Sequence, residues 1–137
     1  MPELPEVETI RQTIWPRLAG RTIDRVEITH PDVVQGWDPA FFAAALAGRR
    51  FVTADRRGKY IIFGLAGASA GMPGPARPAA PLLHVLVHLR MTGRLGCVER
   101  GAEAPPHTHL RLELDDGTDV LFTDTRRFGR WTLLDCP

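Results

Sequence analysis

The sequence is poor in the features that mark membrane, secreted and disulfide-stabilised proteins. No hydrophobic run approaches the roughly 20 residues that a membrane-spanning helix needs, and the N-terminus lacks the apolar stretch of a signal peptide. The 137 residues include two cysteines, Cys97 and Cys136, which are too few and too isolated for a disulfide framework. We therefore expect a cytoplasmic protein, and a chain of this length suits a single domain.

Net charge and lysine are also scarce. The formal net charge is +1, which by itself does not indicate a nucleic-acid-binding protein, although the distribution of charge matters more than its sum. Basic residues gather in two stretches, 49–59 and 126–130, and Lys59 is the single lysine among 17 basic residues. A lysine ammonium is a compact charge whose pKa shifts readily. Lys59 is therefore a candidate for proton transfer, with a chance occurrence as the alternative.

The first ten residues, Met-Pro-Glu-Leu-Pro-Glu-Val-Glu-Thr-Ile, predict a short tail followed at once by an amphipathic helix. Apolar residues recur near the helical period from Val7 onward. Pro5 suits a first helical turn, and the acids there lie where the helix dipole favours negative charge. One interpretation is a capped surface helix with solvated carboxylates. The other is a reactive terminus presented from a fixed position.

Pro2 supports the second interpretation. A small residue at this position normally allows removal of Met1, which leaves a secondary amine at the new terminus. An α-amino group has a pKa of about 8, so much of it is uncharged at neutral pH and can attack an aldehyde-like carbon to form a Schiff base. Glu3, next in the chain, can exchange protons with such an adduct. If Met1 is retained, the nitrogen is an amide and cannot act as a nucleophile.

Residue patterns predict a mainly β fold with flanking helices. The first helix should kink or end at Pro16, and Gly20 is a plausible stop. A second, short helix should span 39–46, capped by Asp38. Strands are expected at 22–29, 51–65, 82–89, 110–114, 120–123 and 130–134.

Within the 51–65 segment, one long strand or a bent pair is expected, with Gly58 as a bulge. Asp116-Gly117 marks a hairpin turn. Two helices and about seven or eight strands indicate a β-sandwich or flattened barrel with helices at its flank.

Five stretches, in this order, resemble those of the formamidopyrimidine-DNA glycosylases, bifunctional enzymes that remove oxidised purines. They are Met1–Ile10, Arg56-Arg57-Gly58-Lys59-Tyr60, His88-Leu89-Arg90-Met91-Thr92-Gly93, His107-Thr108-His109 and Asp124-Thr125-Arg126-Arg127-Phe128-Gly129. The resemblance runs from Pro2 to about Trp131 and covers the family's N-terminal half. It implies one N-terminal catalytic domain over 1–137 with a β-sandwich fold.

The resemblance implies four catalytic residues. Pro2 would be the nucleophile that captures the sugar C1′, Glu3 the proton donor that opens the sugar ring, and Glu6 a supporting carboxylate. Lys59 would contact phosphate and assist β-elimination. Together they imply glycosylase and abasic-site lyase activity.

A second implied group binds double-stranded DNA that carries an oxidised base. Extruding a base leaves a hole in the stack, which an apolar side chain fills while an aromatic wedge kinks the next step. Met91 and Phe128 match the family's filler and wedge, and Arg126 matches the reader of the opposite cytosine. Ordinary core positions for Met91 and Phe128 are the alternative. His88, His107 and Arg127 are candidate phosphate contacts.

Several expectations concern parts that the sequence does not contain. Family members continue into a helix–two-turn–helix element and usually a zinc finger, so we expect no metal or cofactor in this segment. The full-length protein is expected to be a bacterial monomer that associates with the nucleoid through DNA. Two alternatives stay open, namely a related glycosylase for oxidised pyrimidines and a non-catalytic fragment that binds damaged DNA.

Overall fold

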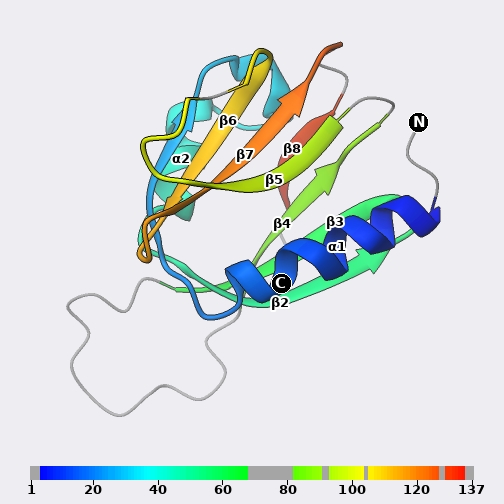
Figure 1. Cartoon of the computed structure of the whole chain (residues 1–137), viewed down its shortest axis with the longest axis horizontal. Coiled ribbons are helices and arrows are strands. Elements are labelled where there is room, and N and C mark those ends of the chain that lie inside the picture. The colour runs from blue at the N-terminus through cyan, green and yellow to red at the C-terminus, as the bar shows by residue number, and fades with distance from the viewer. Residues whose placement is uncertain (1–3, 68–81, 91–92, 104, 127–128, 135–137) are drawn as a thin grey trace.

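The computed structural model describes residues 4–67, 82–90, 93–103, 105–126 and 129–134. Two α-helices, one short 3₁₀ helix and eight strands occur in this part of the chain (Figure 1). In chain order they are α1 (Leu4–Leu18), β1 (Ile23–Ile28), η1 (Pro31–Val33), α2 (Pro39–Leu46), β2 (Arg50–Arg57), β3 (Tyr60–Ala66), β4 (Leu83–His88), β5 (Gly93–Glu99), β6 (Thr108–Leu114), β7 (Thr118–Asp124) and β8 (Arg130–Leu134).

The strands form two four-stranded antiparallel sheets, ordered β1-β6-β7-β5 and β2-β3-β4-β8. Alternate side chains of both sheets point into one shared core, as the packing of two sheet faces requires. Its largest fully buried side chains include Trp131, Phe42 and Phe122. The predicted mainly β fold, a sandwich with helices at its flank, is confirmed.

The helices close the open sides of this sandwich. Helix α1 packs against β2 and β5, which are the edge strands of the two sheets on that side. On the other side α2 packs against the edge strand β1, and Val34 forms a bridge to Trp131 of the edge strand β8. Covering the edges in this way protects unpaired backbone groups from other chains. None of the described helices is long and apolar enough to cross a membrane.

Helix α1 continues past Pro16 to Leu18, so the helix does not end at the proline, which was one of the two predicted outcomes. Val7, Ile14 and Leu18 are buried along one stripe of the helix, and Leu18 follows Pro16 by two residues. Because Pro16 lies in the last turn, burial of Leu18 holds the helix to its end. The chain then turns at Gly20, whose φ of +77° suits glycine.

The β2–β3 segment is a pair of strands, one of the two predicted arrangements, but Gly58 has a different place from the one predicted. Gly58 does not form a bulge inside one strand but lies, with Lys59, in the tight turn of a hairpin in which Arg57 pairs with Tyr60. Gly58 has a φ of +57°, a conformation that costs glycine little. Lys59 is therefore presented at the end of the hairpin. Asp38 caps α2 as predicted, accepting a hydrogen bond of 3.1 Å from the Phe41 N–H.

Candidate nucleic-acid interface and active site

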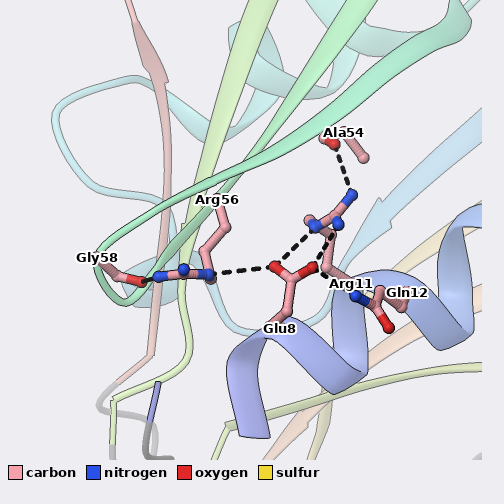
Figure 2. A network of polar contacts seen from close by, with 6 residues as sticks. All are labelled: Glu8, Arg11, Gln12, Ala54, Arg56 and Gly58. Atoms are coloured by element: carbon pink, nitrogen blue, oxygen red, sulfur yellow. Dashed lines mark hydrogen bonds and ion pairs between the residues drawn. The ribbon is translucent and has the colours of Figure 1, made fainter. Parts of the chain in front are cut away.

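Glu8 joins the start of α1 to the β2–β3 hairpin. Its carboxylate accepts hydrogen bonds from Arg11 Nε at 3.0 Å and from Gln12 at 2.8 Å on the same helix, and from Arg56 Nε of β2 at 3.1 Å. Figure 2 shows Glu8 between Arg56 on one side and the two helical partners on the other. Arg11 also donates to the carbonyl of Ala54 at 3.0 Å. Helix and hairpin are thus fastened at two points.

These donors favour the ionised carboxylate. The hydrogen bond from Arg11 is the largest cause, followed by those from Gln12 and Arg56, and together they lower the pKa of Glu8 from 4.5 to about 2. Glu8 is therefore an anion across the whole physiological range. It neutralises part of the arginine cluster beside it and keeps Arg56 in one orientation.

Arg56, held by Glu8, also contacts the turn that carries Lys59. Its Nη1 donates to the carbonyl of Gly58 at 2.9 Å (Figure 2). One guanidinium therefore links the first turns of α1 to the residue that precedes Lys59. The predicted catalytic lysine is held, through its backbone, at a fixed place relative to the helix that begins two residues after Pro2.

His88 lies at the same end of the β2-β3-β4-β8 sheet as the turn that carries Lys59. Tyr60 pairs with His88, and His88 pairs with Arg130; the Tyr60 and His88 rings meet edge to face at 4.6 Å between centroids. Burial lowers the pKa of His88, and the charges of Arg90 and Lys59 lower it further. Nδ1 of His88 accepts a hydrogen bond of 3.0 Å from the Arg90 N–H, which requires that this nitrogen be unprotonated.

That bond helps to shape the connection between β4 and β5, the segment that carries Met91. The Gly93 N–H donates to the Leu89 carbonyl at 2.8 Å, and Arg90 has a φ of +57°. A Cβ on Gly93 would lie 2.5 Å from the Leu89 carbonyl oxygen, so the two ends of this connection approach as closely as glycine permits.

Asp124 organises the connection between β7 and β8, which contains Arg126. Its buried carboxylate accepts the Arg126 N–H at 3.0 Å on one oxygen and the Gly129 N–H at 2.7 Å on the other. A Cβ on Gly129 would lie 2.5 Å from the Phe122 ring. Arg126 is exposed, so a buried anion holds the backbone of an exposed arginine.

His107 lies next to this connection. It is exposed, has a φ of +66°, and its carbonyl accepts the Asp124 N–H at 3.0 Å. Two predicted DNA contacts, His107 and Arg126, are therefore joined through the backbone and side chain of Asp124.

The structure thus brings the predicted residues together in two groups. Lys59 and His88 lie at one end of the β2-β3-β4-β8 sheet beside the Glu8–Arg56 link, and His107 and Arg126 flank Asp124. Glu6 is exposed in the first turn of α1. Pro2, Glu3, Met91, Arg127 and Phe128 lie outside the described residues, so their predicted roles stay predictions.

Glu8 and Asp124 are the two residues of this region that the sequence analysis did not single out. Glu8 stands in the quoted N-terminal motif, three residues before Arg11, a spacing that favours an ion pair on a helix. Asp124 begins the quoted Asp-Thr-Arg-Arg-Phe-Gly motif, and aspartate commonly caps the backbone amides of a following turn. Both local signals can be read from the sequence. The contact between Glu8 and Arg56 cannot, because the two residues are 48 positions apart.

The described residues were also searched for metal-binding clusters and free thiols. No three side chains among their histidines, cysteines, aspartates and glutamates converge on a point that could hold a metal ion. Cys97 is a free, half-buried thiol. It lines an apolar groove between α1 and β5 together with Ile10, Ile14 and Leu95.

Comparison with protein families finds a match over residues 1–131 to the formamidopyrimidine-DNA glycosylase N-terminal domain. The formamidopyrimidine-DNA glycosylase of Moorella thermoacetica is 46% identical over 130 residues, which cover 95% of this chain and 42% of the relative. That of Symbiobacterium thermophilum is 45% identical over 135 residues, or 98% of this chain and 39% of the relative. The chain therefore spans about two fifths of the length of these relatives.

Solved structures show the same relationship. The wild-type Lactococcus lactis Fpg (MutM) bound to DNA that contains an oxidised pyrimidine superposes with a TM-score of 0.83 at 30% identity, over 97% of this chain and 44% of that one. The Lactococcus lactis Fpg in complex with DNA that contains an abasic site gives a TM-score of 0.81 at 30% identity, over 96% and 43% of the two chains.

Proposed function

This chain belongs to the formamidopyrimidine-DNA glycosylase family, and on that premise we propose that it supplies the catalytic residues of a glycosylase and abasic-site lyase acting on oxidised purines in double-stranded DNA. The substrates are 8-oxoguanine and the formamidopyrimidines. The protein works in the bacterial cytoplasm, on the DNA of the nucleoid, and its full-length form is a monomer.

One observation carries the proposal. The Glu8–Arg56–Gly58 contacts hold the Lys59 turn against the first turns of α1, and α1 begins directly after Pro2 and Glu3 in the sequence. The turn that carries the proposed catalytic lysine is thereby kept in fixed relation to the start of α1, the helix that follows Pro2 and Glu3 in the sequence. Such orientation is a large source of catalytic rate.

In the proposed reaction, the Pro2 nitrogen bonds to C1′ as the bond from C1′ to the damaged base breaks, and the base leaves with a proton. Glu3 protonates the ring oxygen, which opens the sugar and gives an iminium. The iminium acidifies the C2′ hydrogen, which passes as a proton to the Glu3 carboxylate, and the C2′–C3′ double bond forms as the 3′ phosphate leaves. Lys59 contacts the phosphate and assists this elimination. Loss of the C4′ proton through the conjugated iminium then expels the 5′ phosphate, and water hydrolyses the remaining C–N bond to release Pro2. Glu6 supports the site.

His88, His107 and Arg127 contact phosphates in this proposal, and Arg126 reads the base opposite the lesion. Met91 and Phe128 take the filling and wedging roles. The exposure of His107 and Arg126 on one pair of connected segments supports this division.

Borohydride trapping tests the proposal. The chain with Met1 removed should form a covalent adduct with a duplex that carries an abasic site or 8-oxoguanine opposite cytosine. The matched controls are an N-terminally acetylated sample and the Lys59→Ala variant. Acetylation should abolish trapping, and Lys59→Ala should lower strand cleavage more than it changes the melting temperature. Equal trapping by the acetylated sample would exclude Pro2 as the nucleophile.

A second substrate class is included because the Lactococcus lactis structure holds DNA with an oxidised pyrimidine. A duplex with an oxidised pyrimidine should therefore be trapped in parallel. Stronger trapping on it than on 8-oxoguanine would assign the chain to that specificity. Binding of the lesion duplexes without any trapping would identify a non-catalytic binding domain.

A further inference from the structure

A pair of histidines lies beneath the two segments that carry His107 and Arg126. His109, in β6, is 2% exposed, and His30 lies in the connection between β1 and η1. Their Nδ1 atoms are 2.7 Å apart, and the rings meet edge to face at 4.6 Å between centroids. The other ring nitrogen of His109, Nε2, lies 2.6 Å from the backbone carbonyl oxygen of Asp124.

These distances determine which nitrogens carry protons. A carbonyl oxygen only accepts hydrogen bonds, so Nε2 of His109 must be protonated. In a neutral ring the Nδ1 of His109 is then an acceptor, and Nδ1 of His30 must donate to it. The order of donation is therefore His30 to His109 to the Asp124 carbonyl.

The end of this chain of bonds is the residue that shapes the β7–β8 connection. The Asp124 side chain accepts the Arg126 and Gly129 N–H groups, and its own N–H donates to His107. His109 also receives the Thr29 N–H on its backbone carbonyl at 2.8 Å. The imidazole of His109 thus connects the segment after β1 with the start of β6 and the end of β7.

We propose that His30 is a positioning residue, which through the protonated Nε2 of His109 fixes the backbone of Asp124 and with it the loop that presents Arg126. Contact of this loop with DNA rests on the proposed function, whereas the position of the loop rests on the hydrogen bonds described above. In this proposal both histidines act through the backbone of Asp124.

Nitrogen-15 spectra of the imidazoles of the intact chain at neutral pH test the bond order directly. His109 should show a protonated Nε2 and an unprotonated Nδ1, and His30 a protonated Nδ1. A His109 ring protonated on Nδ1, or an unprotonated Nδ1 on both rings, would overturn the proposal. This measurement needs no variant and no DNA.

Two substitutions separate donation from packing. His30→Phe keeps an aromatic ring and removes the donor, whereas His30→Gln keeps an amide N–H that can donate. His30→Phe should shift the backbone amide resonances of Arg126 and Gly129, and His30→Gln should restore them toward their original positions. Equal effects of the two variants on these amides would reduce His30 to a packing role.

Affinity for a duplex with an abasic site gives the functional measurement. His30→Phe should weaken binding about fivefold, the effect of one lost buried hydrogen bond. It should have no further effect in an Arg126→Ala background, and additive losses there would contradict positioning through Arg126. If the unaltered chain binds no DNA, the proposed function fails, while the imidazole and amide spectra still decide the role of His30.

Discussion

Replacement of Asp124 by asparagine is the sharpest test of how the β7–β8 connection is held. The carboxylate offers one acceptor oxygen to each of two backbone N–H groups, from Arg126 at 3.0 Å and Gly129 at 2.7 Å, and the residue is 1% exposed. Asparagine has the same shape but presents one oxygen and one NH₂ group. One of the two backbone donors must then face another donor in a site that water does not reach.

The expected loss follows from the bonds removed. A hydrogen bond to a charged group contributes about 1.5–3 kcal/mol, and a buried donor left without a partner costs about 1–3 kcal/mol. The lost hydrogen bond and the unpaired donor are two descriptions of one broken contact, so the two energies are not added. We expect the free energy of unfolding to fall by about 3 kcal/mol. For a chain of this length that corresponds to a decrease in Tm of roughly 10 °C.

The assay combines thermal unfolding with hydrogen exchange at the backbone amides of Arg126 and Gly129. Exchange at both should be faster in Asp124→Asn than in the unaltered chain. Asp119→Asn is the matched control, because Asp119 is a buried carboxylate on the same strand that pairs with Arg100 and Arg111 instead. The control should lower Tm without changing exchange at Gly129. An unchanged Tm and a protected Gly129 amide in Asp124→Asn would show that the Asp124 carboxylate does not hold this connection.

Three further predictions concern ionisable groups. The pKa of Glu8 is lowered to about 2, so its contribution to stability should be complete above pH 4.5 and be lost as pH falls from 4.5 to 2; Glu8→Gln should remove this part of the acid-unfolding profile. The lowered pKa of His88 means that its bond to the Arg90 N–H persists above pH 6.5 and is lost as pH falls through the pKa of the folded state. The Arg90 amide resonance should therefore titrate with a midpoint below 6.5. Burial raises the pKa of the Cys97 thiol, so iodoacetamide should alkylate it more slowly at pH 8 than after unfolding, measured in a variant that lacks the other cysteine.

Most of the fold could be predicted from the sequence, because buried apolar residues recur with the period of the strand or helix that carries them. One strand shows this pattern, because its alternating residues Leu110, Leu112 and Leu114 are all buried. The start of α2 was predicted correctly from Asp38, which caps the helix. The errors came where one residue type permits two structures. Gly58 suited a bulge as well as the hairpin turn that it occupies, and Pro16 ends many helices but not one whose last residue, Leu18, is anchored in the core.

The candidate site was accessible only in part, for a different reason. Short motifs named Lys59, His88, His107 and Arg126, whose side chains do the proposed work. Glu8 and Asp124 stand in these motifs, but the motifs did not indicate their role, which is to fix neighbouring segments by hydrogen bonds. Glu8 acts on Arg56 from 48 positions away, and no local pattern reports a contact of that separation. Asp124 did leave a local signal, since it precedes a glycine-containing turn that needs its amides capped.

The contacts of Arg56 and of Asp124 bear on the proposed binding of DNA by a chain whose net charge is only +1. Attraction to phosphates grows with the number of cations that approach them, and here much of the positive charge is offset nearby, as Glu8 offsets Arg11 and Arg56. Affinity must then depend more on contacts that need no ordering at the moment of binding. Asp124 fixes the backbone beside Arg126, and Arg56 fixes the turn before Lys59, so that ordering is completed during folding. In the proposed function these two sets of contacts therefore contribute to both stability and DNA recognition, and substitutions at either should lower the two together.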